Sequence, residues 1–326
     1  MKFMKRLLCL LAALALPVLS ASGAFSEAAN NWIIPPKEPI RVFFADETEP
    51  FPKDAELLTL RVFPLQGADC MLLSFGNHTM LVDAGRDTQF DTVYKGLQSL
   101  GLSSVEYMFN THPHSDHIGG VRPLLDAGFT FGTFMTVFPH NFIENVRDYD
   151  WFGETLRSLE KHNVPITDLK TEDKIPFGGP DITVYRIPDE YIYDGLTGNE
   201  LAAVLMVRWG DCSVLLTADI EPSTDSQILL ARLYDLKADI LKYPHHGMSK
   251  MAADFYREVD PEYTFFTHGA GNTKEAQALL IHNGYTRMSF ATWGMITMQT
   301  DGKKWIVSQE ILPEKKEVAD TYRFPE

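Results

Sequence analysis

The sequence predicts an α+β protein in which two β-sheets pack together with helices on the outside. Strand-like and helix-like segments mix in both halves of the 326-residue chain, and no repeat of fixed period runs through it. Antiparallel hairpins stand near both ends of this mixed region, with turns at Gly76-Asn77 and at Asp301-Gly302. Because each sheet must bury a face against another layer, this mixture favours paired sheets covered by helices.

The first half of the folded region alternates apolar runs with amphipathic segments. Runs of apolar and β-branched residues, bounded by turn residues, predict strands at 58–63, 71–75, 79–82, 105–110, 130–138 and 182–187. Apolar residues three or four positions apart predict helices at 88–100, 120–127 and 151–162. In the first of these helices the spacing is carried by Phe90, Val93 and Leu97, and Gly101 marks its end.

The second half repeats the mixture. A hairpin is predicted from residues 204–209 and 213–217, with its turn at Gly210-Asp211. The same criteria predict further strands at 239–243, 263–267, 295–299 and 304–309, and helices at 221–233, 252–259 and 274–283.

The N-terminus has the pattern of a secretory signal peptide. Three positive charges within the first six residues precede an apolar run at 7–19, and small residues follow, with cleavage expected after Gly23 or Ala24. The apolar run is short for a permanent membrane span, so residues 1–24 are predicted to be removed and the protein to be secreted or extracytoplasmic. An uncleaved N-terminal anchor is the alternative.

Three regions follow the predicted signal peptide. Residues 25–56, rich in proline and acidic residues, are interpreted as a linker or N-terminal arm, 57–312 as the folded domain, and 313–326 as a charged tail. Cys70 and Cys212 lie in apolar segments without the spacing of a zinc site, and the simplest expectation is two buried free thiols.

The charge balance limits the classes of partner. The formal net charge of -15 becomes -18 once the three positive charges of the signal peptide are removed. So acidic a surface repels phosphate backbones, which disfavours extended nucleic-acid binding. A small anionic or cell-wall-linked substrate, reached at a local cationic site, remains compatible. The composition leaves the oligomeric state open.

The segment 111–120 concentrates metal-ligand residue types. It reads Thr-His-Pro-His-Ser-Asp-His-Ile-Gly-Gly, so that His112, His114, Asp116 and His117 fall within six residues. Burying these side chains without partners would be costly, whereas a turn wrapped around a metal ion would use them all.

Four other segments place polar side chains next to predicted strands. Asp83 and Asp219 each end an apolar strand, and Asn199 leads into one. The pair His245-His246 follows another strand and precedes Gly247. Taken alone, Asp83 could equally be a turn or cap carboxylate.

Together these segments resemble the metallo-β-lactamase superfamily of hydrolases. A closer similarity, to the hydrolase-like domain of ComEC-type competence proteins and their free-standing relatives, is carried by residues 66–71, 81–85, 238–242 and 245–247. The resemblance covers about residues 57–310 and implies a four-layer αββα sandwich with metal ions at one edge of the sheets. Imidazole and carboxylate ligands suit zinc, with manganese or iron as alternatives.

The resemblance also implies a role for each matching residue. His112 and His114 would bind a first divalent ion, Asp116, His117 and His245 a second, and Asp219 would bridge the two. Asp116 would also act catalytically by orienting the metal-bound hydroxide. Asp83 would orient the ligands from behind, and His246 would be either a ligand or a substrate contact.

One position departs from the superfamily pattern. Many members place a further histidine among the ligands of the first metal, and here the matching position is Asn199. His140 fits that role poorly, although it could face the cleft. His268 could line the site or be a satisfied histidine elsewhere. The first metal site is therefore expected to be the weaker one, or to be occupied only with substrate.

The leading hypothesis is an exported, metal-dependent hydrolase, with two zinc ions, of a phosphodiester or related phosphate ester. Paired metal ions would lower the pKa of a shared water and stabilise negative charge on the substrate. Hydrolysis of a β-lactam or lactone is an alternative, as is a noncatalytic cell-surface binding protein with a degenerate metal site.

Overall fold

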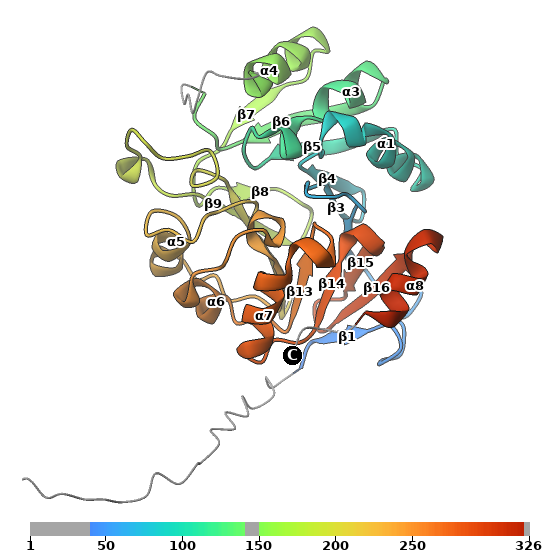
Figure 1. Cartoon of the computed structure of the whole chain (residues 1–326). Helices are drawn as coiled ribbons and strands as arrows, with labels where there is room; N and C mark the ends of the chain where they lie inside the picture. Colours follow the sequence, from blue (N-terminus) through green and yellow to red (C-terminus); the bar gives the residue numbers. More distant parts are fainter. Residues whose placement is uncertain (1–39, 141–149, 323–326) are drawn as a thin grey trace, which may run out of the picture. The chain divides into compact units, whose positions relative to one another are not determined.

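The structure, a computed structural model, describes residues 40–140 and 150–322 (Figure 1). The predicted signal peptide, residues 1–24, lies outside the described residues. Among the helices of the described part, none combines the length and the apolar character that crossing a membrane requires.

Within the described ranges the strands form two sheets. The nine-stranded sheet has the spatial order β1-β16-β15-β2-β3-β4-β5-β6-β7. Its strands are β1 (Val42–Phe44), β2 (Leu58–Val62), β3 (Met71–Phe75), β4 (His78–Val82), β5 (Ser104–Asn110), β6 (Thr130–Thr136), β7 (Ile166–Asp168), β15 (Gly294–Thr300) and β16 (Trp305–Ile311). Strands β4 to β7 run parallel to one another, while β16, β15, β2, β3 and β4 pair antiparallel in that order.

The second sheet, seven-stranded in the same described ranges, has the order β14-β13-β12-β11-β10-β9-β8. Its strands are β8 (Lys174–Ile175), β9 (Asp181–Tyr185), β10 (Val204–Trp209), β11 (Cys212–Leu216), β12 (Ile240–Lys242), β13 (Tyr263–Phe266) and β14 (Met288–Phe290). Strands β11 to β14 are parallel, and β8 to β11 are antiparallel, so the predicted hairpin of β10 and β11 is confirmed.

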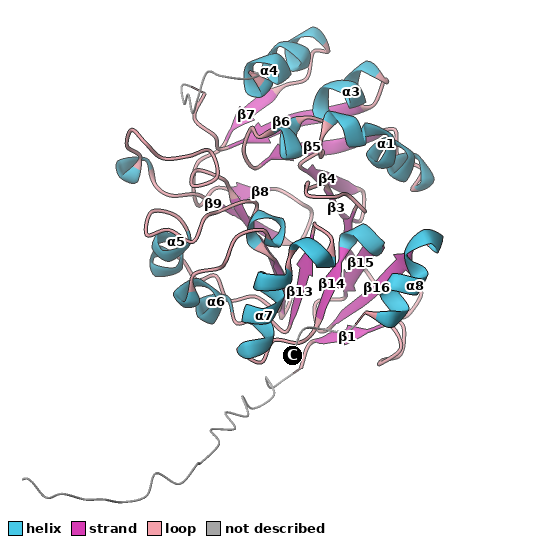
Figure 2. Cartoon of the chain, in the orientation of Figure 1, coloured by secondary structure: helices cyan, strands magenta, loops and turns pink. Residues whose placement is uncertain are grey.

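Helices cover the outer faces of both sheets (Figures 1 and 2). The helices are α1 (Phe90–Ser99), α2 (Ser115–Ile118), α3 (Val121–Asp126), α4 (Trp151–Lys161), α5 (Gln227–Leu233), α6 (Ala253–Val259), α7 (Lys274–His282) and α8 (Lys316–Thr321). Buried residues of α1, α3 and α4 share an apolar cluster with the nine-stranded sheet, and those of α5, α6 and α7 share one with the seven-stranded sheet. The predicted four-layer αββα sandwich is thus confirmed.

The central core lies between the two sheets and joins residues from both. Successive side chains of a strand point to opposite faces, and β10 shows how this builds the layers. Leu205 and Val207 belong to the core between the sheets, whereas Val204 and Met206 pack against the helices on the other face. Both faces of the strand are buried, which explains why it reads as a continuous apolar run. Cys212, at the start of β11, and Cys70 are buried and free, as expected from the sequence.

The differences from the predicted elements lie at edges and ends. The short edge strands β1, β7, β8 and β14 were not predicted, because two or three residues carry too little periodicity. β1 lies in the segment interpreted as a linker or arm, yet it pairs in parallel with β16 and buries Val42 completely. In the predicted charged tail, α8 has no buried residue.

The helix predicted at 221–233 begins only at Gln227. The six residues before it read Glu-Pro-Ser-Thr-Asp-Ser, in which proline removes a backbone donor and the short polar side chains favour turns. The stretch before Gln227 therefore stays non-helical, and the side chain of Glu221 is free to hydrogen-bond across the loop.

Candidate metal centre

The carboxyl ends of two strands from each sheet deliver the ionisable residues that the sequence singled out. In the nine-stranded sheet, Asp83 follows β4 and the histidine motif 111–120 follows β5. In the seven-stranded sheet, Asp219 follows β11 and His246 follows β12. Because each pair of strands is parallel, its carboxyl ends lie at one edge of the sheet, and the two edges together form the site.

The two glycines of the motif permit close packing of the loops. The backbone N–H of Ala84 donates to the carbonyl of His117 at 2.7 Å, and that of Gly120 donates to the carbonyl of Gly85 at 2.9 Å. A Cβ atom at Gly120 would lie 2.0 Å from the carbonyl oxygen of Ala84, a distance that no side chain tolerates. The glycines therefore let the loop after β4 and the loop after β5 lie against each other.

The backbone of the site adopts conformations that non-glycine residues rarely use. Asp83, Ala218, His245 and His246 have φ values of 56°, 45°, 48° and 55°. Such left-handed conformations cost about 1–3 kcal/mol each and persist where the surroundings enforce them. Here they turn the side chains that follow β4, β11 and β12 toward a common point.

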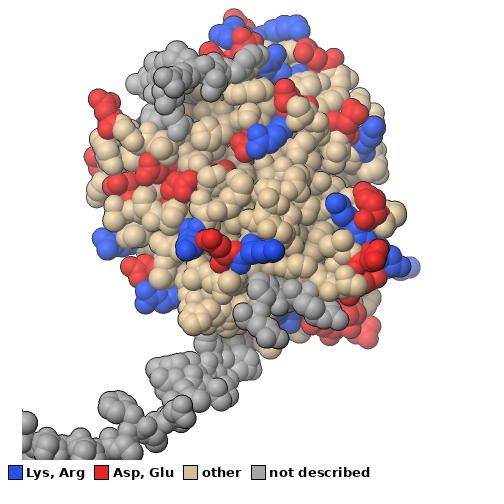
Figure 3. All heavy atoms as spheres, viewed as in Figure 1, with Lys and Arg blue, Asp and Glu red and all other residues tan. Residues whose placement is uncertain are grey.

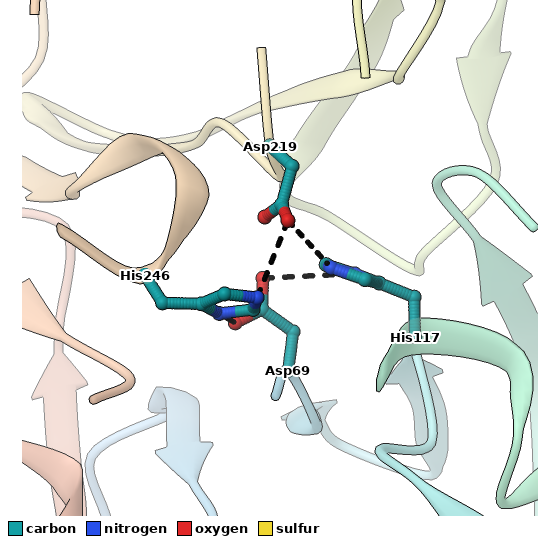
Figure 4. A group of neighbouring side chains, drawn as sticks. All are labelled: Asp69, His117, Asp219 and His246. Atoms are coloured by element: carbon teal, nitrogen blue, oxygen red, sulfur yellow. Dashed lines mark hydrogen bonds and ion pairs between the residues drawn. The ribbon is translucent and has the colours of Figure 1, made fainter. Parts of the chain in front are cut away.

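Asp219 lies at that point (Figure 4). Its Oδ2 is 3.1 Å from Nε2 of His117 and 3.2 Å from Nε2 of His246. Asp116 reaches the same region, with its Oδ2 at 3.6 Å from Nε2 of His246. Carboxylate oxygens and imidazole nitrogens from α2, the β11 loop and the β12 loop thus converge.

The imidazole nitrogens that face this point are the ones that could bind a metal. In the described part of the chain, Nε2 of His112, of His117 and of His246 are buried and have no hydrogen-bond partner of good geometry. Buried polar atoms are normally satisfied, and a bound cation would satisfy these three nitrogens together. Neutral imidazole and carboxylate donors suit a divalent cation, and the residues therefore fit the metal ions that the sequence implied.

The opposite ring nitrogens are fixed by hydrogen bonds. Nδ1 of His117 lies 2.7 Å from Oδ2 of Asp83, and Nδ1 of His246 lies 2.9 Å from Oδ1 of Asp69 and 2.8 Å from Oγ1 of Thr267. A carboxylate on Nδ1 selects the tautomer with a proton there and leaves Nε2 as an electron-pair donor. Asp83 thus has the orienting position that the resemblance implied for it.

Asp69 belongs to the buried group of possible ligands, whose atoms lie within 4.8 Å of one another: Asp69, His117, Asp219 and His246. Asp69, however, faces the Nδ1 edges of the imidazoles, at 3.8 Å from that of His117, whereas Asp219 faces their Nε2 edges. One ion cannot occupy both sides of the rings, so we assign Asp69 to orientation. The sequence motif containing Asp69 contributed to the family resemblance, but nothing in it indicated this contact.

Lys242, at the end of β12, is completely buried beside the site. Its Nζ lies 2.5 Å from Oδ2 of Asp69 and 3.4 Å from Oδ1 of Asp219, and it donates to the carbonyl of Ala218 at 2.6 Å. Burial alone would lower the pKa of Lys242, but the two carboxylates raise it, so the ammonium stays charged. Lys242 thereby engages one oxygen of Asp219 and leaves the other facing the imidazoles.

The electrostatics of the site show how strongly its groups interact. Burial would raise the pKa of Asp219, yet the positive charges of His117, His246 and Lys242 hold it well below its usual range. Burial would lower the pKa of His246, but Asp219 and Asp69 raise it to about 10. For His112, burial and the charges of the neighbouring imidazoles both lower the pKa, which falls well below the ordinary value. Positive charge is therefore favoured next to Asp219.

Asp116 and its neighbour Arg86 form the more accessible side of the site. Oδ2 of Asp116 accepts a hydrogen bond from Nη2 of Arg86 at 2.7 Å, and the same nitrogen donates to the carbonyl of Gly67 at 3.0 Å. The side chain of Arg86 is 39% exposed, that of Asp116 only 15%. The guanidinium thus borders the site from the solvent side. Sequence reasoning did not identify Arg86, which follows Gly85 without any motif of its own.

Three further predicted residues lie around this group. The ring of His114 packs edge-on against that of His112, with centroids 4.6 Å apart. His245 has Nε2 at 3.8 Å from Oδ2 of Asp219, while its Nδ1 lies 2.9 Å from Glu221. Asn199 donates to the same Glu221 oxygen at 3.0 Å. His246, for which the sequence left two roles open, enters the buried group of possible ligands, and His245 flanks it.

His140 and His268 have other partners. Nε2 of His140 pairs with Asp168 of the edge strand β7 at 2.8 Å, and its side chain is 42% exposed. His268 contacts Gln66, with Nδ1 2.5 Å from the amide nitrogen. Burial, together with the charges of His246 and Arg86, lowers the pKa of His268.

A four-layer sandwich with buried imidazoles and carboxylates at the ends of its strands defines a class of metal-dependent hydrolases. The chain belongs to the metallo-beta-lactamase superfamily, whose family model matches residues 64–268. Over 66 residues it is 36% identical to the Beta-lactamase-like protein 2 homolog of Caenorhabditis elegans, a match that spans 20% of this chain and 22% of that protein. The match thus spans about a fifth of that curated relative.

Solved structures with a similar fold include the metallo-beta-lactamase fold protein YhfI from Bacillus subtilis. It is 15% identical, with a TM-score of 0.47, over 72% of this chain and 96% of that chain. CmlA, a diiron beta-hydroxylase from Streptomyces venezuelae, is 13% identical, with a TM-score of 0.48, over 77% of this chain and 55% of that chain.

Proposed function

We propose that this protein is an exported hydrolase that uses two divalent metal ions, zinc in the first instance, to cleave a phosphodiester or related phosphate ester. The observation that carries the proposal is the set of orphaned Nε2 atoms of His112, His117 and His246 around the carboxylates of Asp116 and Asp219. We also propose that the chain is related to ComEC-type hydrolase-like domains, on the similarity of its sequence motifs.

The residues of the site divide the work. His117 and His246 present electron pairs from rings that Asp83 and Asp69 hold in place, so the site is organised before any ion binds. Bound divalent cations supply Lewis-acid charge and lower the pKa of a coordinated water. Asp116, with one oxygen held by Arg86, would orient that water. No serine or cysteine nucleophile is then required.

The charge distribution supports a small anionic substrate. The whole chain carries a formal charge of -15, and the face drawn in Figure 3 shows acidic and basic side chains scattered around a broad uncharged area. Extended binding of a nucleic-acid backbone is disfavoured by such a surface. The half-exposed guanidinium of Arg86 beside Asp116 offers a local contact for a phosphoryl oxygen.

The test uses the chain from residue 25 onward, freed of metal and reloaded with zinc or manganese. Bis(p-nitrophenyl) phosphate, p-nitrophenyl phosphorylcholine, single-stranded DNA and a chromogenic cephalosporin are assayed side by side. Turnover of a phosphate ester, abolished in Asp116→Asn and retained in Asp168→Asn, supports the proposal. Turnover of the cephalosporin alone overturns the phosphodiester assignment, and metal binding without turnover of any substrate overturns the enzymatic one.

Export is tested separately, because it rests on residues 1–24. The full-length chain, expressed in a bacterial host, is expected in the extracytoplasmic fraction with a mature N-terminus after Gly23 or Ala24. N-terminal sequencing of the isolated protein that returns Met1 would contradict cleavage.

A further inference from the structure

We infer that His245 and His246 bind different metal ions, and that His245 provides the third imidazole of the ion held by His112 and His114. This inference rests on the proposed function, since it assumes that two cations bind. It differs from the sequence expectation, in which His245 joined Asp116 and His117 and the ion at His112 and His114 lacked a third imidazole. The assignment follows from where the two adjacent rings point.

Consecutive left-handed residues separate the two rings. With φ of 48° at His245 and 55° at His246, the side chains leave the turn in different directions, and their ring centroids are 6.0 Å apart at an interplanar angle of 67°. Even so, both Nε2 atoms lie near one atom, Oδ2 of Asp219: that of His245 at 3.8 Å and that of His246 at 3.2 Å. Two imidazoles that approach one carboxylate oxygen from different sides are arranged for two ions that share this oxygen.

The partners behind the rings support a ligand role for His245. His117 has Asp83 on its Nδ1, and His246 has Asp69. His245 repeats the arrangement, because its Nδ1 lies 2.9 Å from Oε1 of Glu221 while its Nε2 faces Asp219. In each case a carboxylate holds Nδ1 and directs Nε2 toward Asp219, which is the arrangement typical of histidine metal ligands.

Glu221, which contacts Nδ1 of His245, is itself held in place by a hydrogen bond. Its Oε1 also accepts a hydrogen bond from Nδ2 of Asn199 at 3.0 Å, and Ser249 contributes its hydroxyl to Nδ1 of His245 at 3.0 Å. Asn199 is thus linked to His245 through Glu221.

The position of His112 supports a second metal ion beside Asp219. It is completely buried, its Nε2 has no hydrogen-bond partner in the described part of the chain, and it stands outside the buried group around His117 and His246. Its ring lies 4.1 Å from that of His117, centroid to centroid. A second cation next to Asp219 would give His112 its partner and would be reached by Nε2 of His245.

Titration of the metal-free protein with Zn²⁺ alone, against a competing chelator and with zinc content measured after gel filtration, tests the inference without any activity assay. Wild type is expected to bind two Zn²⁺ per chain. His245→Ala and His246→Ala are each expected to bind one tightly, with the other weakened about 100-fold or more. Glu221→Gln should weaken one site about 10–100-fold.

The double variant His245→Ala/His246→Ala decides whether the rings serve one ion or two. If they serve different ions, it loses tight binding of both; if it retains one tight site, as the single variants do, the inference is overturned. His78→Ala is the matched control, because Nδ1 of His78 also lies on a glutamate, at 2.6 Å from Glu106, at the start of β4. His78→Ala should bind two Zn²⁺ with wild-type affinity.

The outcomes separate this inference from the proposed function. Two tight sites in wild type and in His245→Ala would overturn the inference alone and leave the hydrolase proposal standing. Failure of the wild-type chain to bind any Zn²⁺ would overturn both. Circular dichroism of each variant identifies one that fails to fold, and for such a variant His245→Gln, which keeps a polar side chain of similar reach, replaces the alanine.

Discussion

Replacing Asp83 by asparagine removes one charge from the site and almost no volume. Oδ1 of Asp83 accepts from Nδ2 of Asn110 at 3.0 Å and from the backbone N–H of Thr111 at 2.9 Å, and Oδ2 faces the Thr111 hydroxyl and Nδ1 of His117, both at 2.7 Å. In Asp83→Asn the amide oxygen can keep the first pair of contacts. Its NH₂ group would then face Nδ1 of His117 and favour the tautomer with a proton on Nε2.

The expected magnitudes follow from these contacts. A proton on Nε2 of His117 blocks the nitrogen that faces Asp219, so metal affinity should fall about 10–100-fold, or about 1.4–2.7 kcal/mol. Loss of the charge-assisted hydrogen bond to His117 should lower the free energy of unfolding of the metal-free protein by about 1.5–3 kcal/mol. Both effects have the same origin, and both should appear in one variant.

The assay combines zinc titration against a chelator with urea unfolding of the metal-free protein. Asp168→Asn is the matched control, because Asp168 also pairs with an imidazole, that of His140, at 2.8 Å, but on an exposed edge strand. An exposed pair contributes little, so its affinity and stability should stay at wild-type values. Wild-type zinc affinity in Asp83→Asn would refute the orienting role of Asp83.

Three further outcomes can be tested on the same protein. Gly120→Ala should lower the free energy of unfolding, measured in urea, by at least about 2 kcal/mol, because its Cβ would meet the Ala84 carbonyl. Gly271→Ala, which has open space around its Cβ, should leave the stability unchanged. Equal unfolding midpoints for the two variants would contradict the packing argument. Lys242→Met should lower the free energy of unfolding by about 3–5 kcal/mol, because it removes the cation that contacts Oδ2 of the buried Asp69. An unchanged midpoint in urea unfolding would show that this charge is otherwise compensated. Burial raises the pKa of Cys212 to about 12 and that of Cys70 well above its ordinary value, so that at pH 8 about one Cys212 in 10⁴ is a thiolate. A disulfide reagent should therefore label both cysteines only after denaturation. Rapid labelling of the folded protein would contradict this burial.

Much of the fold could be read from the sequence because its strands are buried on both faces. Such strands appear as uninterrupted apolar runs, as in residues 204–209, and turn residues mark where they stop. Edge strands give no such signal. β7 has all three residues exposed and β8 has only two residues, so their assignment depends on the neighbouring strand rather than on their own side chains.

The site was predictable where its residues share a short segment and not where they meet across the chain. Within 111–120 the residue types alone indicate a metal site. The contact of Asp69 with His246 joins residues 177 positions apart, and that of Lys242 with Asp219 joins residues 23 apart through the end of a buried strand. A lone aspartate or lysine has a solvated alternative in any sequence, and only the packing of the two sheets excludes it.

The adjacent pair His245-His246 shows a further limit of sequence reasoning. Residue type says that both can bind a metal, but side-chain direction is set by φ, and two successive left-handed residues are not indicated by any local pattern. The strain is sustained by the surroundings: the backbone N–H of His245 donates to Ala218 at 3.0 Å, and a Cβ at Gly247 would lie 2.4 Å from the ring of Phe266. The packing of the neighbouring sheet therefore fixes the turn. As a result, the two neighbouring rings reach Asp219 from different sides without a bound ion.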